Sequence, residues 1–167
     1  GNSNGVSCNL GLYADEFDYY YAYDVSNFYT NSLFSGELGV NDIWNKSYSQ
    51  IYSANAVLEG LDNSISIAEA NKKQLQGEAI FVRALLHFYL LNLYGDIPYI
   101  TTTDYLLNSK VSRMPADKIY SLILMDLNKA VELLSEDYVS PERILPNRST
   151  AKALLARVYL YMGMYPE

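Results

Sequence analysis

The chain has 167 residues, half of them hydrophobic and 19% charged, so it can bury the core of one folded domain and is too apolar for an intrinsically disordered segment. Its 12 basic and 19 acidic side chains give a net charge of −7, which makes nucleic acids and anionic membrane surfaces poor partners because both attract basic proteins. No stretch approaches about 18 consecutive apolar residues, so the sequence predicts no transmembrane helix.

The beginning of the chain is rich in Asn, Ser and Gly, which predicts an irregular lead-in over residues 1–12, followed by one domain over residues 13–167. Cys8 is the only cysteine, so an internal disulfide framework is excluded. Its position after Val6 and Ser7 also fits a bacterial lipidation box. No basic and apolar leader precedes it, which argues against that interpretation.

Tyrosine occurs 17 times, and many tyrosines lie in residues 13–36 among Asp and Glu. The aromatic residues there show neither a helical nor a strand period, so we expect a structured loop with a short helical turn. Aromatic rings stack on the C–H faces of sugars, and Asn or Asp can bond their hydroxyls, so this loop holds the only candidate ligand contacts, although packing of these rings in a core or an interface is the favoured interpretation. The candidate contacts are Tyr19, Tyr20, Tyr21, Phe28, Tyr29 and Asn31.

Hydrophobic spacing predicts helices over residues 40–61, 67–93, 115–134 and 149–162, the last with Ser149 or Thr150 as N-cap. Between the second and third, residues 97–103 are extended and β-branched, which fits either a short edge strand or a crossing loop. The helices form two hairpins, so the predicted fold is all-α and tetratricopeptide-like. The last helix is expected to pack against a part of the protein that this chain lacks.

Polar residues within the second predicted helix require partners. Arg83 lies in an apolar stretch and must be paired if it is buried, with Glu78, Asp96 and Asp126 as candidates. A structural clamp between the hairpins is the favoured role, and ligand binding is the alternative. Gly95 is expected to end the helix with a positive φ angle.

The sequence favours binding over catalysis and predicts no cofactor. His87 is the only histidine and lies among apolar residues, where a packing role is expected, and one His and one Cys far apart make a zinc site improbable. Asp15, Glu16 and Asp18 could serve a glycosidase, but neighbouring carboxylates rarely face each other across a sugar. They could instead bond sugar hydroxyls, whereas the spacing of a calcium loop is absent.

Several blocks of this sequence resemble the SusD/RagB family of surface glycan-binding lipoproteins, over roughly residues 10–165. Three of them are Trp44-x3-Tyr48-x2-Ile51-x3-Asn55, Gly77-Glu78-Ala79-x-Phe81-x-Arg83-Ala84 and Leu93-Tyr94-Gly95-Asp96-Ile97-Pro98. Weaker blocks begin at Ala14, Arg113, Ile119 and Ala151 and occur in the family's order. Structural roles are expected for Trp44, Asn55, Glu78, Arg83, Gly95, Asp96, Pro98 and Arg157.

The resemblance implies a non-enzymatic protein that is lipid-anchored on the cell surface at the outer membrane. It also implies two partners, an oligosaccharide or polysaccharide and a SusC-like TonB-dependent transporter, with the helical repeats as scaffold. The lipid anchor and a C-terminal part that supplies much of the sugar site are then expected to lie outside this chain. The alternative hypothesis is a helical-repeat adaptor that binds a peptide or a protein.

Overall fold

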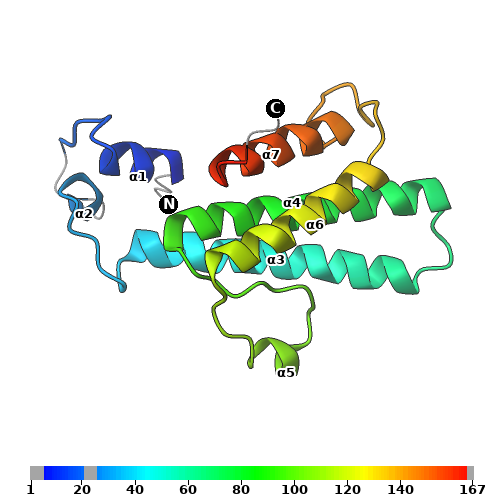
Figure 1. Ribbon diagram of the computed structural model, residues 1–167, viewed down its shortest axis with the longest axis horizontal. Helices are drawn as coiled ribbons and strands as arrows, with labels where there is room; N and C mark the ends of the chain where they lie inside the picture. The colour runs from blue at the N-terminus through cyan, green and yellow to red at the C-terminus, as the bar shows by residue number, and fades with distance from the viewer. Residues whose placement is uncertain (1–5, 21–25, 165–167) are drawn as a thin grey trace. The chain divides into compact units, whose positions relative to one another are not determined.

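A computed structural model describes residues 6–20 and 26–164 of the chain. Within these ranges the regular structure is helical, and the only β pairing is one isolated bridge (Figure 1). The predicted all-α fold is thereby confirmed for the described residues. The described residues divide into two compact units, one ending at Ser47 and the other beginning at Tyr48. The boundary lies inside the single domain that the sequence predicts over residues 13–167.

The first unit contains a helix that the sequence analysis missed. Helix α1 (Val6–Tyr13) lies in the stretch predicted to be irregular, so that prediction was wrong for residues 6–12, and the rest of it lies outside the described residues. Asn, Ser and Gly are weak helix formers, and α1 is stabilised instead by tertiary packing of Leu12 against Phe28 of α2 (Ser26–Tyr29). The short helix α2 lies in the segment where a loop with a helical turn was expected.

The second unit contains the four long helices that the hydrophobic spacing predicts, each within two residues of its expected ends. They are α3 (Leu38–Asn63, of which this unit holds the part from Tyr48), α4 (Glu69–Tyr94), α6 (Ala116–Leu133) and α7 (Arg148–Tyr161). Helix α4 packs against both α6 and α7, and α6 packs against α7. Apolar side chains at helical spacing, such as Ile119, Ile123 and Leu127, are fully buried between them.

One glycine decides how closely α4 approaches the end of α6. A Cβ atom at Gly77 would lie 2.9 Å from Cγ of Leu134 and 3.2 Å from Cβ of Leu133, closer than carbon atoms pack. The absence of a side chain at Gly77 therefore allows Leu134 to be fully buried against α4.

The segment between α4 and α6 is a crossing loop rather than a strand. Gly95 ends α4 with a φ angle of 71°, and Ile97 pairs with Met114 through one antiparallel bridge. The short helix α5 (Tyr105–Asn108) lies at the far end of this loop and is capped by Asp104, whose carboxylate accepts hydrogen bonds from two backbone N–H groups.

The N-cap of α7 differs from the prediction of Ser149 or Thr150. Asn147 caps this helix, because its side-chain oxygen accepts from both the backbone N–H and the hydroxyl of Thr150, each at 2.9 Å. Its amide group donates to the carbonyl of Glu136, so the cap also fixes the preceding loop. The two predicted residues lie two and three positions after the true cap, because the sequence alone does not show which side chain faces the free N–H groups.

Candidate functional site

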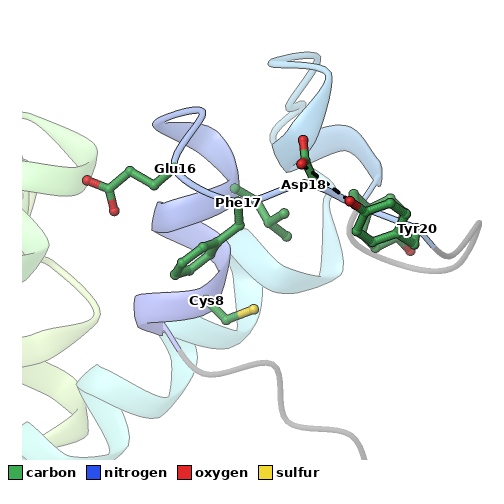
Figure 2. Close-up of a pocket in the computed structure, with 7 residues that line it drawn as sticks. Cys8, Glu16, Phe17, Asp18 and Tyr20 are labelled. Atoms are coloured by element: carbon green, nitrogen blue, oxygen red, sulfur yellow. Dashed lines mark hydrogen bonds between the residues drawn. The ribbon is translucent and has the colours of Figure 1, made fainter.

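An open pocket of about 500 Å³ lies in the first unit, beside the carboxyl end of α1 (Figure 2). Aromatic rings and carboxylates form most of its wall. The lining residues are Cys8, Leu12, Glu16, Phe17, Asp18, Tyr19 and Tyr20.

The turn that ends α1 positions this pocket. Asp15 has a φ angle of 57°, its N–H donates to the carbonyl of Leu12, and the N–H of Glu16 donates to the carbonyl of Gly11 at 2.9 Å. This is the Schellman arrangement, with Asp15 in the left-handed conformation that Asp tolerates better than most residues. The chain therefore reverses sharply after α1 and brings residues 16–20 back along the helix.

The reversal places the ring of Phe17 directly on the bare backbone of Gly11. A Cβ atom at Gly11 would overlap Cε2 of Phe17, so the ring uses the space where a side chain would be. Phe17 nevertheless remains 50% exposed. In Figure 2 Glu16 lies on one side of the Phe17 ring, and Asp18 and Tyr20 lie on the other. A supported ring with an open surface is suited to stacking against the C–H face of a sugar.

The charged groups of the pocket are carboxylates, which accept hydrogen bonds, and not cations. The hydroxyl of Tyr20 donates to Oδ2 of Asp18 over 3.4 Å, and Tyr20 itself is 83% exposed. None of the described residues that line the pocket is a Lys or an Arg. The described residues of the chain also contain no group of three His, Cys, Asp or Glu side chains that could hold a metal ion. The pocket is therefore suited to a ligand that donates hydrogen bonds from hydroxyl groups.

The six predicted ligand contacts do not all lie at the pocket. Tyr19 and Tyr20 line the pocket, and the Tyr29 ring is exposed with its centroid 6.2 Å from that of Tyr19. Phe28 is only 2% exposed and packs against Leu12, so it belongs to the core of the first unit and offers no ring face to a ligand. Tyr21 lies outside the described residues.

Asn31 has a structural reason to be an asparagine. Its φ angle is 53°, and the N–H of Ser32 donates back to the carbonyl of Asn27, which repeats at the end of α2 the turn that ends α1. The side chain of Asn31 is exposed. Phe17 was not among the predicted contacts, although its place between Glu16 and Asp18 repeats the pattern of aromatic and acidic residues on which its neighbours were selected.

A second polar cluster is buried in the second unit and centres on Arg83. Its guanidinium donates to both carboxylate oxygens of Asp126, from Nε and from Nη2, each at 2.8 Å. Its Nη1 donates to the side-chain oxygen of Asn55 at 2.9 Å, and the amide of Asn55 donates to the carbonyl of Ile100. Burial opposes the charge of Arg83, but the hydrogen bonds and charge of Asp126 outweigh burial and raise the pKa of the guanidinium.

His87 extends this cluster to the crossing loop. Its Nδ1 lies 2.9 Å from the carbonyl of Arg83, and the N–H of Ile100 donates to its Nε2 at 3.2 Å. Because a carbonyl only accepts and the Ile100 N–H only donates, the ring is neutral with its proton on Nδ1. Burial lowers the pKa of His87 to about 4, which agrees with that tautomer. The ring also stacks on Tyr99 with 3.9 Å between centroids.

Tyr99 and Tyr48 complete the contacts of the loop. The hydroxyl of Tyr99 donates to Oδ2 of Asp126 at 2.6 Å, and that of Tyr48 donates to the carbonyl of Pro98 at 2.7 Å. Burial raises the pKa of both hydroxyls, so both stay protonated and act as donors. Every nitrogen of the Arg83 guanidinium thus donates a hydrogen bond inside the protein, and the cluster links α3, α4, α6 and the crossing loop.

The other residues with expected structural roles differ in their surroundings. Glu78 is half-buried and accepts a hydrogen bond from Gln74, whereas Asp96 is exposed and its backbone carbonyl accepts from Arg113. Trp44 is half-buried in the first unit, and Arg157 is exposed on α7. In the part of the chain that the structure describes, no helix combines the length and apolar content needed to cross a bilayer.

The known proteins that this chain resembles include members of the SusD-like family. A family model described as SusD-like, starch-binding and associating with the outer membrane matches residues 10–160. A SusD-like protein of Formosa agariphila is 34% identical over 130 residues, which are 77% of this chain and 25% of that protein. The chain therefore spans about a quarter of the length of this curated relative.

Two solved structures resemble the fold of this chain closely. One is described as a laminarin-binding SusD-like protein and is 26% identical to this chain, with a TM-score of 0.77. The match covers 84% of this chain and 30% of the chain in that structure. The other is described as a crystal structure with xylogluco-oligosaccharide and is also 26% identical, with a TM-score of 0.73. That match covers 84% of this chain and 28% of the chain in that structure.

Proposed function

Because this chain belongs to the SusD-like family of starch-binding proteins that associate with the outer membrane, we propose that it binds oligosaccharides for a nutrient-uptake system of that membrane. The observation that carries the proposal is the family match over residues 10–160. The structures with laminarin and xylogluco-oligosaccharide in their descriptions support the ligand class. The exposed rings and carboxylates beside α1 supply groups of the kind that bind sugars.

The proposal assigns binding rather than hydrolysis to this chain. The rings of Phe17, Tyr19 and Tyr20 stack on sugar faces, Tyr29 extends that surface, and Asp18 accepts hydrogen bonds from hydroxyl groups. The long helices of the second unit act as a scaffold. We further propose a lipid anchor at the cell surface and contact with a SusC-like TonB-dependent transporter, which the family resemblance supports.

Affinity electrophoresis in gels containing laminarin, xyloglucan or starch tests the ligand class. The protein should be retarded in at least one of these gels, and the variants Phe17→Ala and Tyr20→Ala should lose most of that retardation because they remove a stacking surface. Tyr105→Ala is the matched control, since Tyr105 is an equally exposed tyrosine on α5, in the other unit. Equal retardation of all three variants would contradict the site, and no retardation in any gel would contradict the function.

The transporter contact needs a separate experiment. Expression with a TonB-dependent transporter encoded beside the gene, followed by purification of that transporter in detergent, should co-purify the protein. Failure to co-purify, together with binding of a soluble peptide or protein partner, would favour the adaptor hypothesis instead.

A further inference from the structure

The charge pattern around the α1 pocket points to a narrower class of ligand. Glu16 and Asp18 are the charged groups that line the pocket, and both are carboxylates. The Phe17 ring lies beside these carboxylates, is supported by Gly11 and remains exposed. This open ring is a feature separate from the acidic side chains, and it indicates a binding surface rather than an acidic loop. An anionic ligand that stacks on the Phe17 ring would therefore share this pocket with both carboxylates, which lie on either side of the ring in Figure 2.

The described residues of the first unit offer no free basic side chain to offset this negative charge. Lys46 is the only Lys or Arg in residues 1–47, and its ammonium group is bonded to Asp42 at 2.7 Å. Like charges a few ångströms apart repel strongly near a protein surface. At the substituted position, a sulfate group or a uronate carboxylate replaces a group that bears a hydroxyl hydrogen, so the glycan loses one donor to a carboxylate acceptor there as well as meeting repulsion.

We infer that the α1 pocket selects neutral sugar units and rejects sulfated or uronate-bearing glycans, through the carboxylates of Glu16 and Asp18. This inference rests on the proposed function, because it specifies the ligand of the same pocket. The Phe17 ring supplies binding to any pyranose face, and the two carboxylates supply the discrimination.

The test uses pairs of polysaccharides that share a backbone and differ in charge. Laminarin is compared with laminarin sulfate, and highly methyl-esterified pectin with polygalacturonate, by affinity electrophoresis and titration calorimetry. In each pair that is bound, the charged member should bind about tenfold or more weakly at low ionic strength. The difference should shrink at high salt, in about 0.5 M NaCl, because salt screens charge repulsion and leaves a steric obstacle unchanged.

The double variant Glu16→Gln, Asp18→Asn separates charge from shape. It retains side chains of nearly the same size, and the ratio of the affinities for the charged and neutral members should move toward one. Circular dichroism checks that the variant is folded, and Asp117→Asn, which removes an exposed carboxylate of α6 that does not line the pocket, should leave the ratio unchanged.

The outcomes distinguish this inference from the proposed function. Equal or tighter binding of the charged members, or an unchanged ratio in the double variant, overturns the inference while glycan binding stands. Absence of binding to every polysaccharide, charged or neutral, overturns the proposed function and this inference together.

Discussion

Arg83 and Asp126, 43 residues apart in the chain, form a two-point ion pair between α4 and α6, with both N···O distances at 2.8 Å. A pair of this geometry satisfies the planar guanidinium and both carboxylate oxygens at once. Asn55 accepts a further hydrogen bond from the guanidinium, and Tyr99 donates one to the carboxylate, so each of the two buried charges has a second polar partner. Such a cluster fixes the relative positions of the helices more than it adds net stability.

Removal of one charge from this pair should be strongly destabilising. Asp126→Ala leaves the buried guanidinium without its anion and should reduce the free energy of unfolding by about 3–5 kcal/mol in urea denaturation. Glu132→Ala is the matched control, because Glu132 forms an exposed pair with Lys129 at 3.2 Å on the same helix. The control should change stability by less than about 1 kcal/mol, and equal losses in the two variants would contradict the role of the buried pair.

The buried neutral His87 should make the protein sensitive to mild acid. Its pKa is about 4 in the folded protein and about 6.5 in the unfolded chain, so the unfolded chain binds the proton first as the pH falls. The stability from His87 is therefore complete above about pH 6.5, decreases as the pH falls toward about 4, and reaches a total loss of about 3 kcal/mol.

Urea denaturation at pH values from about 7.5 to about 4 measures this dependence, with His87→Phe as the comparison. The variant retains a ring that can stack on Tyr99 and has no proton to bind, so its stability should depend less on pH over this window even though it is lower at neutral pH. Parallel curves for the two proteins would show that another group causes the acid sensitivity.

Two glycines in long helices should respond to alanine in opposite directions. Gly77→Ala places a Cβ atom 2.9 Å from Cγ of the buried Leu134, so α4 and α6 must separate, and a loss of about 1–3 kcal/mol is expected. At Gly60, in α3, a Cβ atom would meet no heavy atom within 4 Å, and Gly60→Ala should add about 0.5–1 kcal/mol because alanine favours helix. Thermal denaturation of the two variants compares them, and a gain for Gly77→Ala would contradict the close approach.

Glu59 should control the order of the loop that carries α5. Its carboxylate accepts from the N–H and hydroxyl of Thr103 and from the hydroxyl of Thr102, and the hydrogen bonds from Thr103 are the main cause of its lowered pKa. Glu59→Ala removes all three contacts, so amide hydrogens of residues 102–108 should exchange faster with solvent.

Hydrogen exchange followed by mass spectrometry measures this effect. Glu69→Ala provides the control, because Glu69 forms an exposed contact with Lys73 within α4 and does not touch the loop. An unchanged exchange rate in residues 102–108 of the Glu59 variant would show that the Ile97–Met114 bridge and the Asp104 cap hold the loop without Glu59.

The partner of Arg83 illustrates how far sequence reasoning extends. The need for a partner follows from the apolar neighbours of Arg83, and Asp126 was one of three candidates. Only the packing of α6 on α4 brings its carboxylate to the guanidinium, while Glu78 bonds Gln74 and Asp96 stays exposed. The aromatic segment shows the same limit, since Phe28 and Tyr20 look equivalent in sequence but one is buried and the other is open to solvent.

The sequence by itself determined the four long helices, because the period of their apolar residues is a local property of the chain. It also determined the family, because the residue blocks of these helices are contiguous. Only the tertiary structure decided that α1 is a helix, that Phe17 lies on Gly11, and that Asn147 rather than Ser149 caps α7. Each of these depends on contacts between segments that spacing along one segment does not encode, since burial and hydrogen bonding are settled by which surfaces meet.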